Sequence, residues 1–164
     1  MKKGIVLLIV LIGILSTLIG CSIKKPPQKI ELNANGLYTT SNIRVSGNTN
    51  LPKGSILELQ ISEIGKNDLT YDEKIKVEEK GYFSWLDTDL DTSKDYTINL
   101  LFDPSKQTGE IQKKYGEKGE YIKDGEYSGL IKSKKGVQIV KITGTIEKTG
   151  GNKKGGIFYL QSPK

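Results

Sequence analysis

SILELQISEI, residues 55–64, is the stretch that decides the fold of this chain. In an extended segment successive side chains point to opposite sides, so Leu57, Leu59 and Ile61 share one face. Polar residues, beginning with Glu58 and Gln60, occupy the other face. Strict alternation of this kind predicts a β-strand with one side against a core and the other side in solvent. The stretch therefore predicts a sheet protein.

Short segments with a similar pattern recur along the chain, separated by Gly, Pro, Asn and Asp. They predict further strands at residues 38–46, 74–78, 82–86, 96–102, 137–147 and 157–161. Residues 79–81 predict a hairpin turn, and the Gly- and Lys-rich residues 148–156 join the last two strands. Trp85 shares a face with Phe83, so we expect it in the core rather than as a platform for a ligand.

A single segment, residues 108–115, has a helical pattern. Ile111 and Tyr115 are four positions apart, and Gly116 suits a helix C-terminus. The rest of the chain beyond the N-terminal region is strand and turn at regular spacing. This organisation predicts an all-β fold, a single mostly antiparallel β-sandwich of about seven or eight strands.

Three short motifs resemble immunoglobulin-like or transthyretin-like sandwich modules of bacterial surface proteins. They are Leu51-Pro52-Lys53-Gly54 before an alternating strand, Gly81-Tyr82-Phe83, and Tyr96-Thr97-Ile98. The resemblance covers residues 43–102 and implies an Ig-like sandwich. Because the matching positions are packing and turn residues, it implies no catalytic position. The disulfide typical of immunoglobulin domains is missing, since the chain has one cysteine.

The N-terminus has the organisation of an export signal. Met1-Lys2-Lys3 precedes an apolar run of 17 residues, 4–20, with Ser16 and Thr17 as its polar breaks. A basic start, a short apolar middle and a small residue at the end are typical of a secretory signal. The run is also at the lower limit for a membrane span, so a transmembrane anchor is one alternative, and an ordinary signal peptide is another.

The end of this run, Leu18-Ile19-Gly20-Cys21, resembles the lipobox of bacterial lipoproteins. The resemblance implies a thioether between Cys21 and diacylglycerol, and cleavage between Gly20 and Cys21. Cys21 has no second cysteine to pair with, and the polar residues 22–29 follow at once. Two or three acyl chains hold a protein at a membrane where one does not. We therefore expect a protein anchored by lipid on the extracytoplasmic face of the cell membrane.

These observations divide the chain into three parts. We expect the signal peptide at residues 1–20, the lipidated cysteine and a flexible tether at 21–35, and the β-sandwich at 36–164. The mature chain of 144 residues is the size of one domain.

Composition excludes several kinds of site. The chain has no histidine and one cysteine, which excludes a Cys/His zinc site, a Ser-His-Asp triad and a Cys-His dyad. No pair among the 19 acidic residues stands out as a glycosidase pair, so we expect no enzyme and no cofactor beyond the acyl lipid. The net charge of +6 falls to about +4 without Lys2 and Lys3. Outside the cell, a basic domain meets anionic wall polymer or lipid headgroups rather than nucleic acid.

One string resembles a metal site. Asp87, Asp89 and Asp91 present alternate carboxylates, which Ca²⁺ can use as oxygen ligands. The string departs from an EF-hand loop, because Thr92 and Ile98 stand where glycine and glutamate are needed. The alternative is an acidic loop between two strands.

A basic patch is expected near the C-terminus. Residues 132–164 carry eight lysines and one acid, Glu147. Lys148, Lys153 and Lys154 lie in the Gly-rich loop and are the candidates for a surface contact with anionic wall polymer or another envelope protein. The alternative is that lysines near strand edges keep the sheets from aggregating.

These features together predict a non-catalytic binding or interaction module held at the cell envelope. Two alternatives remain. One is a prophage-type immunity lipoprotein that acts in superinfection exclusion. The other is an accessory subunit, or an enzyme, that acts on cell-wall polymer.

Overall fold

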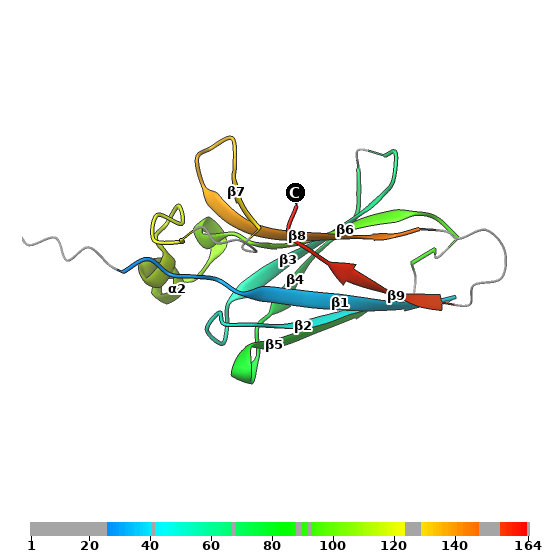
Figure 1. Cartoon of the computed structure of the whole chain (residues 1–164), viewed down its shortest axis with the longest axis horizontal. Coiled ribbons are helices and arrows are strands. Elements are labelled where there is room, and N and C mark those ends of the chain that lie inside the picture. The colour runs from blue at the N-terminus through cyan, green and yellow to red at the C-terminus, as the bar shows by residue number, and fades with distance from the viewer. Residues whose placement is uncertain are drawn as a thin grey trace, which may run out of the picture.

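Two antiparallel sheets face each other in the computed structural model (Figure 1). The structure describes residues 26–40, 42–66, 68–87, 90–91, 93–123, 129–147 and 155–163. These residues form nine strands, arranged as a sheet of four and a sheet of five. The predicted all-β sandwich is confirmed.

The order of the strands is that of an immunoglobulin-like sandwich. The four-stranded sheet has the order β5 (Tyr82–Asp87), β2 (Ile43–Thr49), β1 (Leu32–Thr39) and β9 (Gly155–Leu160). The five-stranded sheet has the order β4 (Leu69–Lys76), β3 (Ile56–Glu63), β6 (Tyr96–Phe102), β8 (Gln138–Ile146) and β7 (Leu130–Lys132). In chain order, β1, β2 and β5 correspond to immunoglobulin strands A, B and E, and β3, β4, β6 and β8 correspond to C, C′, F and G. Strands β7 and β9 extend this pattern at two edges.

The core lies between the sheets and is built by alternating residues. Leu57, Leu59 and Ile61 on β3 are each 0% exposed, as the opening stretch of sequence predicts. Trp85 is half-buried and packs edge-to-face on Tyr71, with ring centroids 6.0 Å apart. It therefore joins the core as expected.

One glycine in β1 makes room for an aromatic ring. Gly36 faces the core, and a Cβ built there would lie 1.9 Å from Cζ of Phe158 on β9. The ring of Phe158 therefore occupies the space that any other side chain at residue 36 would need. This close packing attaches the edge strand β9 to β1.

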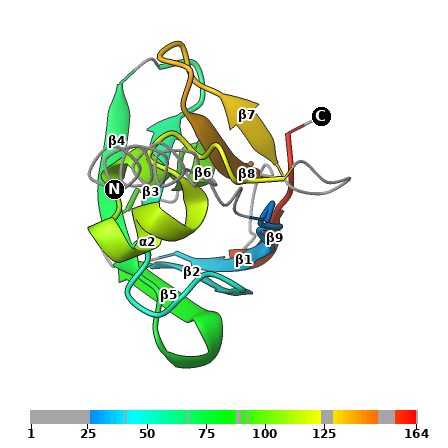
Figure 2. The same cartoon turned by 90° about the vertical axis from the view of Figure 1, so that its left-hand side faces the viewer.

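Helical segments cover one end of the sandwich (Figure 2). The chain leaves β6 into η2 (Pro104–Lys106) and α2 (Gly109–Tyr115), so the predicted helix begins one residue later than expected. Tyr115 is buried, with its ring 5.3 Å from that of Phe102. Gly116 ends the helix at φ 87°, and its N–H donates to the carbonyl of Gln112 at 2.7 Å.

The first part of the fold corrects two predictions. Residues 38–46 are not one strand, because β1 ends at Thr39 and β2 begins at Ile43. The predicted tether is also too long, since β1 begins at Leu32 and Ile30 is already buried. Asn, Ala and Gly in β1 are poor strand formers, and pairing with β2 and β9 outweighs this preference.

One predicted connection also differs. Residues 79–81 do not form a hairpin, because β4 and β5 belong to different sheets, and η1 (Glu79–Gly81) carries the chain across. The last two strands, β8 and β9, also belong to different sheets. Strand β4 starts at Leu69, before the predicted residue 74, and the short β7 was not predicted. A local pattern indicates where a strand ends but does not indicate which sheet receives the next one.

Candidate functional site

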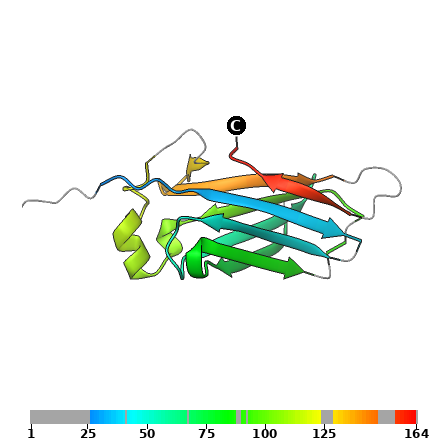
Figure 3. The same ribbon diagram turned by 60° about the horizontal axis from the view of Figure 1, so that its bottom comes forward.

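The outer face of the four-stranded sheet is nearly free of charge. Cross-strand pairing places its outward residues in rows that run from β5 to β9. The first row is Leu86, Arg44, Leu37 and Ile157, the second is Ser84, Ser46, Asn35 and Tyr159, and the third is Tyr82, Asn48 and Asn33. We call these residues the low-charge face, because Arg44 is the charged member. Figure 3 shows the sheet from this side.

The low-charge face also gathers most of the exposed apolar surface. Of the seven large hydrophobic residues that are exposed in the described chain, five lie here: Leu37, Tyr82, Leu86, Ile157 and Tyr159. Ile157 and Tyr159 on β9 are 65% and 64% exposed. Contiguous exposed apolar residues on a small protein commonly mark a site of interaction.

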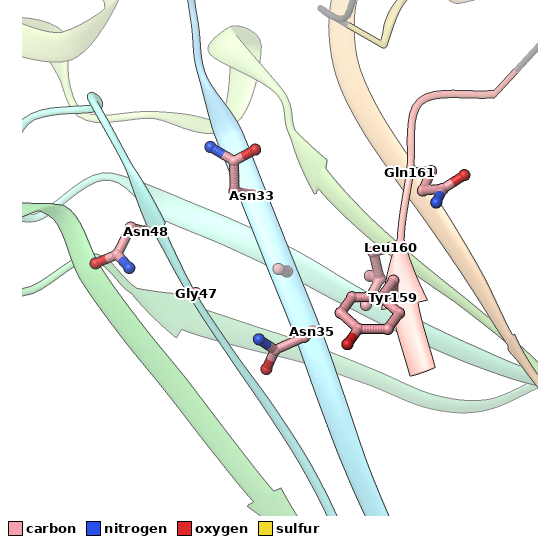
Figure 4. A pocket seen from close by; sticks show the side chains of 8 residues that line it. Asn33, Asn35, Gly47, Asn48, Tyr159, Leu160 and Gln161 are labelled. Atoms are coloured by element: carbon pink, nitrogen blue, oxygen red, sulfur yellow. The ribbon is translucent and has the colours of Figure 1, made fainter. Parts of the chain in front are cut away.

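A shallow depression of about 340 Å³ lies in the polar part of this face, where β2, β1 and β9 meet (Figure 4). Four amide side chains and one tyrosine line it: Asn33, Asn35, Asn48, Gln161 and Tyr159. Ala34, Gly47 and Leu160 complete the lining. Within the described ranges, none of the four amides forms a side-chain hydrogen bond with another protein group. Their donors and acceptors are therefore available to a ligand.

A second depression of about 430 Å³ lies on the other side of β9. Thr143, Gly144 and Thr145 of β8 form one wall, and Ile157, Phe158, Tyr159 and Gln161 form the other. The chain is fixed here by a pair of backbone hydrogen bonds between Thr143 and Gln161, at 2.7 and 2.8 Å. Tyr159 and Gln161 line both depressions, so β9 is a ridge between two uncharged hollows.

The outer face of the five-stranded sheet differs in chemistry. Glu58 is only 6% exposed, and its carboxylate accepts a hydrogen bond from Nζ of Lys106 at 2.8 Å. This hydrogen bond raises the pKa of Lys106 above its ordinary value. One amide here is engaged as well, since Oδ1 of Asn99 accepts from the hydroxyl of Thr143 at 3.0 Å.

The predicted metal string is described only in part. Asp87 accepts hydrogen bonds from the N–H of Leu90 at 3.0 Å and from the hydroxyl of Tyr71 at 3.3 Å. Asp91 accepts from the hydroxyl of Ser93 at 2.6 Å, and this bond is the main cause of the lowered pKa of Asp91. Asp89 lies outside the described residues. Among the residues that are described, no three acidic, histidine or cysteine side chains are placed to hold a metal ion.

The other predicted site residues lie outside the described ranges. These are the lipobox residues Leu18, Ile19 and Gly20, the lipidation site Cys21, and the loop residues Lys148, Lys153 and Lys154. In the part of the chain that the structure describes, no helix has the length and apolar character needed to span a bilayer. The structure therefore leaves the predicted anchor and the predicted basic contact as predictions.

The low-charge face was not predicted, although the sequence contains a signal for it. From residue 32 to residue 52, Arg44 is the one charged residue, in a chain of which 27% is charged. Residues 155–163 contain no charge at all. These two stretches form β1, β2 and β9. A strand whose outward positions carry little charge therefore indicates a face that is suited to contact with another molecule.

The strand order defines the class of this domain, an immunoglobulin-like β-sandwich with a helical cap at one end. Comparison with known proteins adds no relative: the chain matches no family model, no curated protein and no solved structure. Any function must therefore be argued from the chain itself.

Proposed function

We propose that this protein is a lipid-anchored component of the cell envelope, whose sandwich binds another envelope component without catalysis. The lipobox-like Leu18-Ile19-Gly20-Cys21 supports the anchor. The observation that carries the binding role is the low-charge face, which has five exposed apolar side chains and three amides without a side-chain hydrogen bond, with Gln161 as a fourth such amide at the end of β9. Solvated surfaces are normally rich in charge, and a face that lacks it is suited to contact.

The position of the N-terminal segment supports a particular orientation. The N–H of Gln28 donates to the carbonyl of Tyr121 at 2.6 Å, and the N–H of Lys123 donates to the carbonyl of Gln28 at 2.8 Å. The chain is thus held against the helical end of the sandwich from Gln28 onward. The seven residues from Cys21 to the one before Gln28 can span at most roughly 25 Å. We infer that the helical end faces the membrane and that the low-charge face extends away from it.

The carboxylates with shifted pKa values give a wall-degrading activity no support. Ion pairs and hydrogen bonds lower the pKa of three of them: Glu63 beside Lys66, Asp91 beside Ser93, and Glu110 beside Lys113. A general acid at neutral pH needs the opposite shift. We therefore develop the binding role rather than the enzymatic alternative.

Metabolic labelling tests the anchor. Cells that express the wild type or Cys21→Ala are grown with a palmitate analogue, and the immunoprecipitated protein is examined for label. We expect label on the wild type and none on the variant, because Cys21 is the one thiol in the chain. Equal labelling of both proteins, or of neither, would contradict the anchor.

Sedimentation tests the binding role. The full chain, purified in detergent, is mixed with isolated envelopes from which lipid has been extracted. We expect it to sediment with them, and to do so equally in about 0.5 M sodium chloride, where the screening length is roughly 4 Å. If the protein stays in the supernatant both at low salt and in the high-salt buffer, the proposal is contradicted.

A further inference from the structure

We propose that the depression lined by Asn33, Asn35, Asn48, Gln161 and Tyr159 is a binding site for a neutral carbohydrate chain, built of hexose or N-acetylhexosamine rings. This inference deepens the proposed function and rests on it. It assigns the class of ligand and the part of the low-charge face that holds it.

The hydrogen-bonding chemistry of the site fits hydroxyl and acetamido groups. Each amide offers two N–H donors and a carbonyl acceptor, and a sugar hydroxyl both donates and accepts. Four such amides from β1, β2 and the end of β9 line the depression (Figure 4), and none forms a side-chain hydrogen bond within the described protein. A sugar chain can therefore replace the water on these groups while keeping their hydrogen bonds.

Tyr159 supplies an aromatic surface at the same place. Tyr159 is 64% exposed and lines both depressions. The face of an aromatic ring carries partial negative charge, so it attracts the polarised C–H groups on the apolar side of a sugar ring. A sugar ring has an apolar side of C–H groups and hydroxyl groups around its edge. An aromatic side chain beside several amides can contact both.

Charge distinguishes a neutral ligand from an anionic one. No lysine, arginine, aspartate or glutamate lines either depression beside β9. A phosphate or carboxylate bound there would lose water without gaining an opposite charge, which is unfavourable. Arg44 belongs to the row with Leu37 and Leu86, next to the row of Asn35, and it lines neither depression.

Shape favours an extended chain over a compact ligand. Both depressions are shallow and open to solvent, and they lie side by side along β9. The third row of the face runs on from Asn33 and Asn48 to Tyr82 on β5. Four strands at about 4.8 Å spacing make this surface roughly 14 Å wide, enough for several sugar rings in a row.

A protein partner would use a different part of the face. Protein interfaces concentrate apolar residues at their centre. The first row, in which Leu37, Leu86 and Ile157 are apolar and Arg44 is charged, lies beyond the second row, whereas the depression itself is lined by amides. The site therefore favours carbohydrate, and association through the apolar row is the alternative that the experiment must detect.

Calorimetric titration of the full chain in detergent tests the assignment. The probes are cellohexaose and chitohexaose, which separate plain hexose from N-acetylhexosamine. We expect at least one to bind with a dissociation constant below about 1 mM, unchanged in about 0.5 M salt. Tyr159→Ala and Asn35→Ala should each weaken binding at least about tenfold. Leu69→Ala removes an exposed apolar side chain outside the face and should change nothing.

Two results would overturn the inference. One is the absence of binding to either hexasaccharide while the chain still sediments with extracted envelopes, which leaves the proposed function intact and excludes this ligand. The other is binding that Tyr159→Ala does not weaken.

If neither hexasaccharide binds and sedimentation velocity shows self-association that Ile157→Asp abolishes, the face is an interface between copies of this chain. Failure of both sedimentation with envelopes and oligosaccharide binding would reject the proposed function as well.

Discussion

The two outer faces of the sandwich are made of strands with the same alternating pattern but have opposite chemistry. On the five-stranded sheet, Glu58 lies between Lys74 on β4 and Leu101 on β6, and Lys106 covers it. On the four-stranded sheet, Asn35 lies between Ser46 and Tyr159, both of which are uncharged. On one face the least exposed carboxylate is paired within the chain, and on the other the amides around Asn35 have no partner in the described protein.

This difference indicates what each face is for. A surface whose charges and amides already pair with one another gains little from a partner, because binding must first break those pairs. A surface of unpaired amides and exposed rings can gain hydrogen bonds and stacking without such a loss. The comparison therefore assigns contact to the four-stranded sheet and support to the five-stranded sheet.

The largest effect should come from removing the attachment of β9, which carries Tyr159. In Gly36→Ala the new Cβ would lie 1.9 Å from the ring of Phe158, so the ring must move out of the core. Overpacking of this kind costs roughly 2 kcal/mol. The melting temperature of the variant should fall by about 6 °C, and binding at the low-charge face should be lost because β9 shifts.

Gly109→Ala is the matched control for this substitution. A Cβ at Gly109 meets no atom within 4 Å, and Gly109 is the first residue of α2. Alanine there should leave stability unchanged or raise it by up to about 1 kcal/mol. Equal destabilisation by the two substitutions would show that Phe158 does not depend on Gly36.

A smaller effect should follow from breaking the support on the opposite face. Lys106→Met removes the partner of Glu58, whose side chain is 8% exposed, and leaves a buried carboxylate without its ion pair. Because Lys106 itself is 54% exposed, the expected loss of unfolding free energy is only about 1 kcal/mol.

Lys113→Met is the comparison for Lys106→Met, since its ion pair with Glu110 is exposed on both sides. Its denaturant concentration at the unfolding midpoint should equal that of the wild type, because an exposed ion pair contributes little to stability. If both variants unfold at the wild-type denaturant concentration, the Glu58–Lys106 pair does not support the fold. Envelope binding should be unchanged in either variant, because neither residue lies on the low-charge face.

The sequence predicts the inner halves of the strands better than their outer halves. Leu57, Leu59 and Ile61 are predicted to be buried and are, because burial of one face is a local property of alternation. The helix 108–115 is found for the same reason, since its apolar spacing and its glycine end are local. The fold class follows from such segments without knowledge of their partners.

Local sequence patterns do not show which distant strands pair with one another. The sequence predicts the first half of β1 as tether and its end as part of the strand 38–46. Asn33, Asn35 and Gly36 have little preference for a strand, and they form one because they pair with β2 and β9. The depression was missed for a related reason. Asn33, Asn48 and Gln161 are far apart in the chain and come together only through the order β2-β1-β9.

The smallest effect on stability should accompany the largest effect on contact. Ser46 stands in the middle of the low-charge face, paired with Asn35 on one side and Ser84 on the other. In Ser46→Lys a long charged side chain would cover this row, while the strand keeps its backbone pairing. The free energy of unfolding should change by no more than about 0.5 kcal/mol, since the position faces solvent.

Gln60→Lys makes the same change of charge on the opposite face, where Asp72 lies across the pair of strands. We expect this control to keep full binding to extracted envelopes and Ser46→Lys to lose it, although both fold as the wild type does. Equal binding by the two lysine variants would show that the absence of charge on the four-stranded sheet has no part in recognition. The contrast between the faces would then reflect only how each sheet is covered in the folded chain.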